Sequence, residues 1–340
     1  MRCVKVLREE AEAARYRLNA ARMVRKDHRI LESGESVLIP IVDGVSDETL
    51  NAMGYEIGEA ENPWRQTFRD PIGNIRGSLH FTEELKSLLP HKWEHLGDVV
   101  IVRLPDELTP FRQEIGEAYA TELNAKAVLQ EVGVIEGVTR RPKVINIFGT
   151  DSETLHREGD ILYRMDPAKV MFSSGNFEEK RRMGALNCKG ETIVDMFAGI
   201  GYFTLPLARR TGAERIIACE INPESYHYLV ENVRLNMVED IVEPVLGDNR
   251  DLPGECFADR ILMGYVGSTR DFLSKALKLI KPGGKIHYHD TVGIEGLPSA
   301  LLSDIRNACG DRKHRIDKVK VVKSYGPCTL HTVVDITIMD

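Results

Sequence analysis

Residues 192–203 read Thr-Ile-Val-Asp-Met-Phe-Ala-Gly-Ile-Gly-Tyr-Phe, and this stretch decides the fold. A short apolar run ends at Asp195, a Gly-x-Gly turn follows at Gly199 and Gly201, and a helix-like segment continues to Arg210. Glycines between a strand and a helix allow the backbone to approach a nucleotide-like ligand at the helix N-terminus. The pattern therefore predicts a strand, a ligand-binding turn and a helix. An ordinary strand-to-helix turn is the alternative for the glycines taken alone.

A second apolar run, residues 215–220, ends in an acid and strengthens this interpretation. Glu220 lies 19 residues after Gly201, where a carboxylate can accept hydrogen bonds from both ribose hydroxyls of a nucleoside. Position 204 is Thr, so the third glycine of a dinucleotide-binding turn is missing, and the chain has no Gly-Lys-Ser/Thr phosphate-binding loop. These features favour adenosine without a pyrophosphate, and S-adenosylmethionine fits that description.

The rest of the C-terminal half has the alternation of a doubly wound α/β domain. Asn222 can cap a helix whose first turn contains Pro223, and the apolar residues that follow have helical spacing. Two later runs, 319–322 and 329–338, flank a turn and predict an antiparallel pair at the edge of the sheet. Five segments are expected to be strands: 192–196, 215–220, 242–246, 259–263 and 285–290.

Polar or glycine-rich residues end four of these strands, and ligands bind beyond the carboxyl ends of the strands in such a sheet. Asp195 and Glu220 end the first two strands. Gly247-Asp-Asn-Arg250 ends the third, and Met263-Gly-Tyr-Val-Gly-Ser268 ends the fourth. Within the third, Asp248 can accept a hydrogen bond from the exocyclic amine of adenine, and Asn249 can both donate and accept. A simple turn at 247–249 is the alternative.

The remaining chain divides into smaller units. The first contains a helix-like stretch, 9–24, and a strand-like run, 37–42. The second contains a long helical stretch, 110–131, and then a strand-like run, 143–148. A polar segment with Pro and Gly separates them and predicts a linker. Four divisions are expected: a small N-terminal domain at 1–60, the linker at 61–74, an α+β domain at 75–165 and the doubly wound domain at 166–340.

The composition is that of an ordinary globular protein and excludes several classes. At 340 residues, with 42% hydrophobic and 29% charged residues, the chain can build two or three domains with full cores. It has no run of about 18 apolar residues that would span a membrane, and its N-terminus lacks the apolar core of a secretory signal. The six cysteines are scattered without a C-x-x-C pair, so we expect reduced thiols, no metal site and a cytoplasmic location.

The net charge of −7 does not attract nucleic acid to the chain as a whole, but the charge is unevenly distributed. Residues 1–30 hold nine Lys or Arg against four acids, and residues 311–323 hold six against two. Local basic patches of this kind can follow a phosphate backbone. Solvated helix and strand faces are the alternative for either patch.

Several motifs together resemble a known family. They are Phe172-Ser-Ser-Gly-Asn176 with Glu179-Lys180, Asp195-Met-Phe-Ala-Gly-Ile-Gly-Tyr-Phe203, Glu220-Ile-Asn-Pro223, Glu231-Asn232, Leu235-Asn236 and Gly247-Asp-Asn-Arg250. This set closely resembles archaeal and eukaryotic enzymes of wybutosine synthesis, the tRNA(Phe) 4-demethylwyosine aminocarboxypropyltransferases. The resemblance is tight over roughly 140–340, and Thr154-x-His156-x-Glu158-Gly159 and Trp93-x-x-Leu-Gly-Asp98 extend it. It implies a Rossmann-like class I methyltransferase domain that uses S-adenosylmethionine as a co-substrate.

The tRNA guanine-37 N1-methyltransferases are a sister family with the same fold and co-substrate, and residues 1–60 resemble their small N-terminal domain. These methyltransferases typically carry Phe-Ser-Pro-Arg, Gly-Asp-Ala-Arg and Asn-Leu-Pro at three motifs. This chain instead has Phe172-Ser-Ser-Gly175, Gly247-Asp-Asn-Arg250 and Met263-Gly-Tyr265, and all three departures favour aminocarboxypropyl transfer. In that family we expect Pro before Ser268, but position 267 is Gly. Methylation at N1 of guanosine 37 stays open as an alternative, as does a catalytically inert RNA-binding protein of the same fold.

The resemblance also implies a set of site residues. Ser173 and Lys180 are expected to orient the methionine arm of S-adenosylmethionine, and a solvated helix face is the alternative for Lys180. No side chain is required as a covalent nucleophile. The expected acceptor is the wyosine precursor in the anticodon region of tRNA(Phe). The protein is expected to be a monomer and to bind no membrane. The expected co-substrate-binding residues are Phe172, Ser173, Lys180, Asp195, Phe197, Gly199, Gly201, Glu220, Ile221, Asp248, Asn249 and Tyr265.

Overall fold

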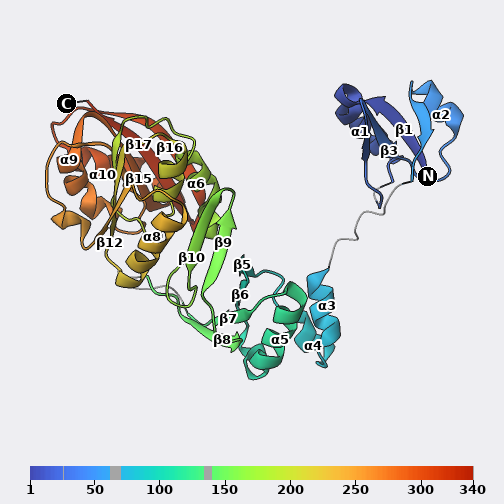
Figure 1. The fold of residues 1–340 in the computed structure, drawn as a ribbon, viewed down its shortest axis with the longest axis horizontal. Coiled ribbons are helices and arrows are strands. Elements are labelled where there is room, and N and C mark those ends of the chain that lie inside the picture. Colours follow the sequence, from blue (N-terminus) through green and yellow to red (C-terminus); the bar gives the residue numbers. More distant parts are fainter. Residues whose placement is uncertain (26, 62–69, 134–139, 340) are drawn as a thin grey trace. The chain divides into compact units, whose positions relative to one another are not determined.

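The computed structural model describes residues 1–25, 27–61, 70–133 and 140–339, which form two compact units, 1–73 and 74–340 (Figure 1). The expected linker at 61–74 lies largely outside the described residues, at 62–69. Its end differs from the expectation, because helix α3 (Pro71–Ser78) begins there. The side chain of Asp70 accepts a hydrogen bond from the amide of Gly73, and proline suits a first helical turn, so the sequence contains a helix start that its polarity concealed. The other expected domain boundaries stay predictions.

The N-terminal unit is an antiparallel sheet with two helices. Its strands are β1 (Arg2–Leu7), β2 (Leu31–Ser33), β3 (Ser36–Pro40) and β4 (Glu56–Glu59), in the order β2-β3-β1-β4. Helix α1 (Ala11–Ala20) buries Leu18, and helix α2 (Asp47–Ala52) is capped by the side chain of Ser46. The helix expected at 9–24 is shorter, since the chain turns at Arg22 with a φ of +57°. Strand β1 was not expected, because charged residues mask its buried positions.

Helix α3 leads into the second unit, where α4 (Glu83–Ser87) and a four-stranded sheet follow. Its strands are β5 (Glu94–Leu96), β6 (Val99–Val102), β7 (Ala127–Glu131) and β8 (Val144–Phe148). They lie in sequence order, with β6 and β7 parallel and the outer pairs antiparallel.

The helix expected at 110–131 is wrong in its second half. Helix α5 (Arg112–Leu123) ends at Asn124, whose φ of +53° lies in the left-handed region, and residues 127–131 form strand β7. Ala127 and Leu129 are therefore buried in the sheet and not on a helix face. Short apolar runs do not distinguish a buried strand from a helix by spacing alone.

The C-terminal part of this unit is the doubly wound domain that the sequence predicts. Parallel strands β11 (Thr192–Asp195), β12 (Arg215–Glu220), β13 (Val242–Leu246), β14 (Ala258–Met263) and β15 (Ile280–Gly293) are joined by antiparallel β16 (His314–Gly326) and β17 (Thr329–Ile338). The sheet order is β13-β12-β11-β14-β15-β17-β16. The expected closing pair is thus present, with β16 as the edge strand.

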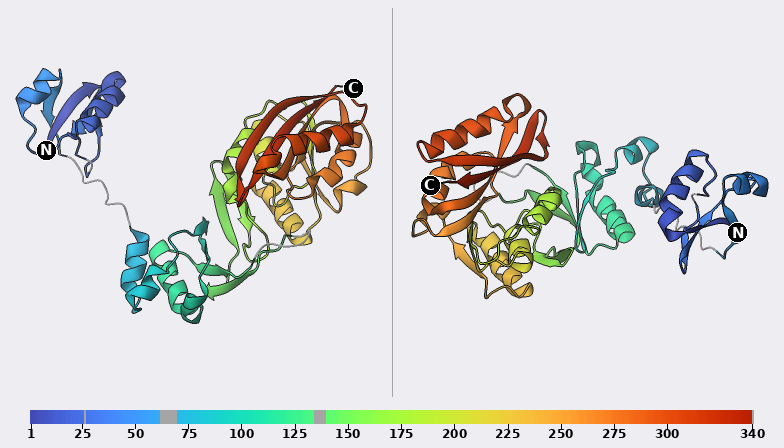
Figure 2. Two further views of the ribbon diagram at one scale, coloured as in Figure 1. Left: turned by 180° about the vertical axis from the view of Figure 1, so that it is seen from behind. Right: turned by 90° about the horizontal axis from the view of Figure 1, so that it is seen from above.

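Helices cover both faces of this sheet. Ile193 packs with α7 (Thr204–Arg210) and α8 (Pro223–Leu235), whereas Val194 packs with α9 (Leu273–Leu279) and α10 (Ser299–Cys309). Neighbouring residues of a strand point to opposite faces, so the centre of β11, Ile193 and Val194, is apolar on both faces. Figure 2 shows α8 and α10 on opposite sides of the strands. Within the described residues, no helix has both the length and the apolar character needed to cross a membrane.

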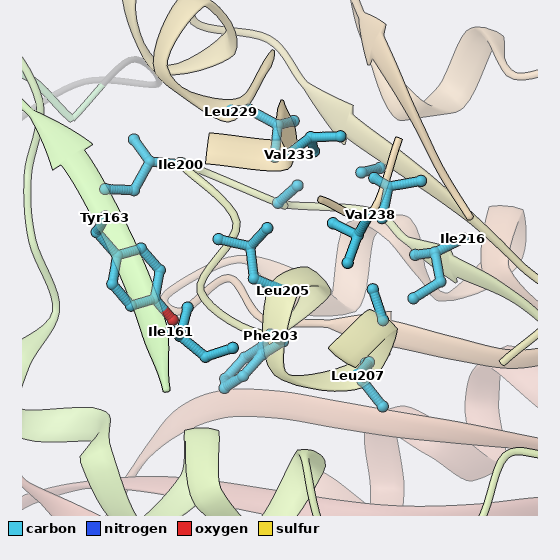
Figure 3. Packing of buried hydrophobic residues seen from close by; sticks show 14 of the residues in the cluster. Ile161, Tyr163, Ile200, Phe203, Leu205, Leu207, Ile216, Leu229, Val233 and Val238 are labelled. Carbon is cyan, nitrogen blue, oxygen red and sulfur yellow. The ribbon is translucent and has the colours of Figure 1, made fainter. Parts of the chain in front are cut away.

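A hairpin of β9 (Thr154–Glu158) and β10 (Ile161–Met165) packs against α8. Asn232 on α8 and Asn236, which follows its last residue, accept hydrogen bonds from the amides of Arg164 and Leu162, at 2.6 and 3.0 Å, and donate back to the carbonyls of the same two residues. Figure 3 shows Tyr163 of this hairpin in one core with residues of α7 and α8. The two asparagines thus hold the hairpin on the doubly wound domain.

Candidate active site

The glycine-rich turn after β11 is fixed by backbone conformation and close packing. Gly199 and Gly201 have φ angles of +59° and +103°, which favour glycine. A Cβ at Gly201 would lie 2.8 Å from Leu205, and one at Gly199 would lie 2.5 Å from the ring of Tyr202. Neither position therefore accepts a larger residue without rearrangement.

Asp195 stabilises this turn through hydrogen bonds of its side chain. Its buried carboxylate accepts hydrogen bonds from the Thr204 hydroxyl at 2.8 Å and from the Phe197 amide at 3.2 Å. Burial raises the pKa of Asp195 to about 6. The side chain does not line the cavity described below, so its contribution to a ligand would be to position the turn.

A cavity of about 760 Å³ lies at the carboxyl ends of β11 to β14. This is the size of a small-molecule site. Among the residues expected from the sequence, Phe172, Ser173, Phe197, Gly199, Glu220, Ile221, Asp248, Asn249 and Tyr265 line it. Asp195, Gly201 and Lys180 do not. The binding role of each residue stays a prediction.

Glu220 joins the turn to the second strand at the cavity wall. Its two carboxylate oxygens accept hydrogen bonds from the amides of Gly199 at 2.8 Å and Asn222 at 2.7 Å. Burial raises the pKa of Glu220. Each carboxylate oxygen can accept more than one hydrogen bond, so both ribose hydroxyls could still be bound here.

Replacing Glu220 by Ala should weaken S-adenosylmethionine binding by roughly 1–3 kcal/mol, because hydrogen bonds to a charged group are lost. Glu220→Gln is the matched control, since its amide keeps one acceptor oxygen for the turn. Titration calorimetry should give the lowest affinity for S-adenosylmethionine in Glu220→Ala, an intermediate affinity in Glu220→Gln and the highest in the parent protein. Unchanged affinity in a folded Glu220→Ala variant would remove Glu220 from the site.

The residues expected to bind adenine differ in their present partners. Asp248 accepts hydrogen bonds from its neighbour Arg250, whose guanidinium holds the pKa of Asp248 below its usual range. Asn249 donates through Nδ2 to the Met196 carbonyl at 2.7 Å, while its buried Oδ1 has no hydrogen-bond partner among the described residues. An orphaned buried acceptor in the wall of this cavity fits an amine donor such as that of adenine.

An aromatic group lines the same cavity. The rings of Phe197 and Tyr265 are stacked, with centroids 5.2 Å apart and planes inclined by 19°. Phe272 meets Phe197 edge to face at 5.0 Å. These rings provide apolar surface for a flat ligand.

Gly267 explains the departure from the expected proline. Its φ is +107°, and its amide donates a hydrogen bond to Asp290 at 2.7 Å. Proline has a φ near −65° and no amide hydrogen, so it fits neither feature. The loop after β14 therefore has its own conformation in this chain.

Lys180 does not reach the cavity. Its ammonium lies 2.6 Å from the carboxylate of Glu158 and 4.3 Å from the centroid of the Phe172 ring, and the side chain is only 3% exposed. Burial acts to raise the pKa of Glu158, but hydrogen bonds from His156 and Lys180 hold that pKa below its usual value. The solvated helix face considered for Lys180 is therefore wrong. Phe172, which the Lys180 ammonium contacts, lines the cavity, whereas Lys180 itself does not.

The sequence analysis missed several residues of the cavity, and two of them lie on the antiparallel strands. Lys323 on β16 and His331 on β17 both line the cavity. The amine of Lys323 would lie 2.9 Å from a Cβ at Gly175, so glycine provides the space for it. We counted Lys323 in the basic patch at 311–323. The signal for His331 was a histidine within the apolar run 329–338.

Comparison with known proteins gives matches along most of the chain. Residues 154–317 match the TRM5/TYW2 methyltransferase domain, residues 75–152 the TYW2 N-terminal domain, and residues 3–49 the tRNA methyltransferase 5 N-terminal domain. The tRNA(Phe) (4-demethylwyosine(37)-C(7)) aminocarboxypropyltransferase of Pyrococcus horikoshii is 41% identical over 263 residues, 77% of this chain and 94% of that protein. The tRNA (guanine(37)-N(1))-methyltransferase Trm5b of Pyrococcus abyssi is 35% identical over 98% of this chain and 97% of its own.

Solved structures give the same picture. P. horikoshii TYW2 in complex with MeSAdo has a TM-score of 0.72 at 38% identity, covering 79% of this chain and 99% of that one. Methanocaldococcus jannaschii TYW2 in complex with AdoMet has a TM-score of 0.60 at 34% identity, covering 73% and 99%. A complex of aTrm5 and tRNALeu has a TM-score of 0.68 at 26% identity, covering 99% of each chain.

Proposed function

The chain belongs to the TRM5/TYW2 family, and from this premise we propose that it transfers the 3-amino-3-carboxypropyl group of S-adenosylmethionine to C7 of 4-demethylwyosine at position 37 of tRNA(Phe). The observation that carries the proposal is the 41% identity to an aminocarboxypropyltransferase over 94% of that enzyme's length. The TYW2-type match at 75–152 supports the same assignment. The cavity supplies a carboxylate, an orphaned amide oxygen and aromatic surface for S-adenosylmethionine.

The chemistry depends on orientation. Methyl transfer and aminocarboxypropyl transfer break different carbon–sulfur bonds of one co-substrate, and the bond that breaks is the one whose carbon faces the acceptor. Positioning of the reacting atoms is therefore the main contribution of the protein. Residues that hold the methionine arm decide the product.

Guanosine-37 N1-methylation is the second candidate. The N-terminal match at 3–49 and the full-length similarity to Trm5b favour it. One assay separates the two: tRNA(Phe) carrying guanosine or 4-demethylwyosine at position 37 is incubated with S-adenosylmethionine labelled in the methyl or in the carboxyl group. We expect carboxyl label in the 4-demethylwyosine tRNA and methylthioadenosine as the by-product. Methyl label in the guanosine tRNA would overturn the proposal.

We assign the methionine carboxylate to Lys323, in place of Lys180. The Lys323 amine has no hydrogen-bond or ion-pair partner among the described residues; it lies beside Gly175, and Lys323 lines the same cavity as Ser173. Burial and Arg140 lower the pKa of Lys323, while Glu94 acts in the opposite sense. A carboxylate would compensate the two neighbouring cations.

Lys323→Met should weaken S-adenosylmethionine by roughly 1.5–3 kcal/mol and leave methylthioadenosine nearly unchanged, because only the former carries the carboxylate. Lys318→Met is the matched control, since Lys318 lies on the same strand but is exposed. Calorimetry with both ligands tests the assignment. An equal loss for both ligands would place Lys323 in the adenosine pocket or in the fold.

We expect the surface of the protein that binds tRNA to be basic, and two groups of basic residues are candidates for it. In the patch at 311–323, Arg315 pairs with Asp317 and Lys320 with Glu179, so this patch offers fewer unpaired charges than its sequence suggests. On α1 of the N-terminal unit, Arg17 is exposed beside Tyr16, which is 79% exposed. Exposed arginines and aromatic rings suit RNA.

Binding of tRNA should therefore weaken as the salt concentration rises. The logarithm of the association constant should fall against the logarithm of the salt concentration with a slope of about −0.7 to −0.9 per neutralised phosphate. Arg17→Glu should make the slope shallower by about one such unit, whereas Arg315→Glu should change it little. Filter binding between about 50 and 200 mM salt measures both. A slope that Arg17→Glu does not change would make the α1 surface a solvated face only.

The anticodon region as binding site, a monomeric state and a cytoplasmic location belong to the same proposal.

A further inference from the structure

Two buried histidines connect the cavity to a buried carboxylate. The cavity-lining His331 lies 3.1 Å, through Nε2, from Nδ1 of His289 on β15. The Nε2 of His289 lies 3.7 Å from Oε1 of Glu179 on α6 (Phe177–Met183) and has no hydrogen-bond partner among the described residues. His289 and Glu179 are 0% exposed. The three side chains form a line from the core to the cavity.

The position of Glu179 beside His289 favours one tautomer of each ring. The negative charge of Glu179 favours a proton on the nearby Nε2 of His289, so Nδ1 of His289 keeps its lone pair. His331 must then donate its Nε2 hydrogen to that lone pair. A neutral imidazole has one hydrogen on nitrogen, so Nδ1 of His331 is left as a hydrogen-bond acceptor.

The surroundings keep His331 uncharged. Burial, together with Lys323 on β16 and Arg140, lowers the pKa of His331 to about 4, while Glu179 acts in the opposite sense. His289 on β15 is also buried, and burial together with His331 lowers its pKa well below the usual value. At neutral pH both rings are therefore free of charge, and His331 can accept a proton.

We propose that His331 is the general base of the transfer reaction, with His289 and Glu179 as positioning residues. The inference rests on the proposed function, because carbon C7 must lose a proton. C7 forms a bond to the methylene carbon next to sulfur, the carbon–sulfur bond breaks with its electron pair on sulfur, and methylthioadenosine leaves. The proton on C7 passes to Nδ1 of His331, which becomes imidazolium and later releases the proton to water.

His331→Gln is the discriminating variant. The glutamine amide nitrogen can take the place of Nε2 and keep the hydrogen bond to His289, but the variant has no base at the position of Nδ1. A merely structural histidine would tolerate this change. A general base contributes about 10²–10⁴-fold, so the single-turnover rate of carboxyl-label transfer should fall by about that factor. The affinities for S-adenosylmethionine and tRNA should stay within about twofold. His227→Gln, at an exposed histidine on α8 outside the cavity, is the control.

A second variant keeps the test decisive if Gln perturbs the fold. His331→Ala opens space in the cavity wall, and added imidazole should restore transfer in proportion to the neutral form of imidazole. Near-parental transfer by a folded His331→Gln variant, or no rescue of a folded His331→Ala variant, would overturn the assignment. Absence of carboxyl transfer by the parent protein would instead refute the proposed function, so the two failures are distinct.

Discussion

Lys180→Ala should lower the free energy of unfolding by about 3–5 kcal/mol, the effect of removing one partner from a buried ion pair. The reason is that Glu158, 12% exposed and 2.6 Å from the Lys180 ammonium, would keep its charge without its main partner. The ring of Phe172 would also lose the ammonium 4.3 Å from its centroid. Urea denaturation followed by circular dichroism measures the change. Lys189→Ala, at an exposed lysine, should have little effect.

The double variant Lys180→Met with Glu158→Leu tests the cause. Replacing both partners by apolar residues of similar volume leaves no stranded charge, so stability should recover most of the loss. The ligand response is equally informative. The affinities for S-adenosylmethionine and for methylthioadenosine should fall together in Lys180→Ala, because Lys180 acts through Phe172 in the cavity wall. A selective loss of S-adenosylmethionine would support direct contact with the methionine arm.

The second large effect is expected at Arg182 on α6 (Phe177–Met183). Its guanidinium lies 2.6 Å from Glu179, which is fully buried, and 2.6 Å from Asp335 on β17. Arg182→Met leaves two carboxylates without this cation, so a loss of about 3–5 kcal/mol is expected at pH 7. Arg181→Met is the matched control, because this neighbouring arginine is exposed and forms an ion pair with exposed Glu178.

The pH dependence of this loss follows from Asp335. Burial acts to raise the pKa of Asp335, but hydrogen bonds from His287 and Arg182 hold that pKa far below its usual value. A carboxyl group whose pKa is lowered by folding adds stability above its unfolded pKa of about 3.9, and that stability is lost as the pH falls toward the folded pKa. The difference between the parent and Arg182→Met should thus be constant between about pH 5 and 7 and shrink in acid. A difference that grows in acid would contradict the assignment.

The parallel sheet and its ligand edge could be predicted because local signals suffice there. Apolar runs of strand length, the two glycines with positive φ and the Asn222-Pro223 helix start are all readable in sequence. The helix expected at 110–131 failed because β7 is buried on both faces and therefore has no alternation. Helix α5 ends at Asn124, which has a left-handed φ. That conformation depends on the surrounding fold, so the spacing of the apolar residues does not reveal where the helix ends.

The candidate site could be predicted only where residues follow strand ends. Glu220 is the last residue of β12, and Asn249 follows shortly after the end of β13, so position along the chain gives position in space. Lys323 and His331 reach the same cavity from antiparallel strands near the edge of the sheet, and no motif spacing connects them to Gly199. The depth of Lys180 was also hidden, because it depends on Glu158 in the hairpin and on three aromatic rings.

The two asparagines of α8 have a consequence for self-association. Strand β10 pairs with β9 on one side only, and an unpaired strand edge is a template on which another chain can add a strand. The carboxamides of Asn232 and Asn236 occupy the amide and carbonyl groups of Leu162 and Arg164 along the other side. A carboxamide has the donor and acceptor of a peptide group, so the helix presents two surrogate peptides to the strand. This edge of β10 is thereby closed to strand exchange with a second molecule.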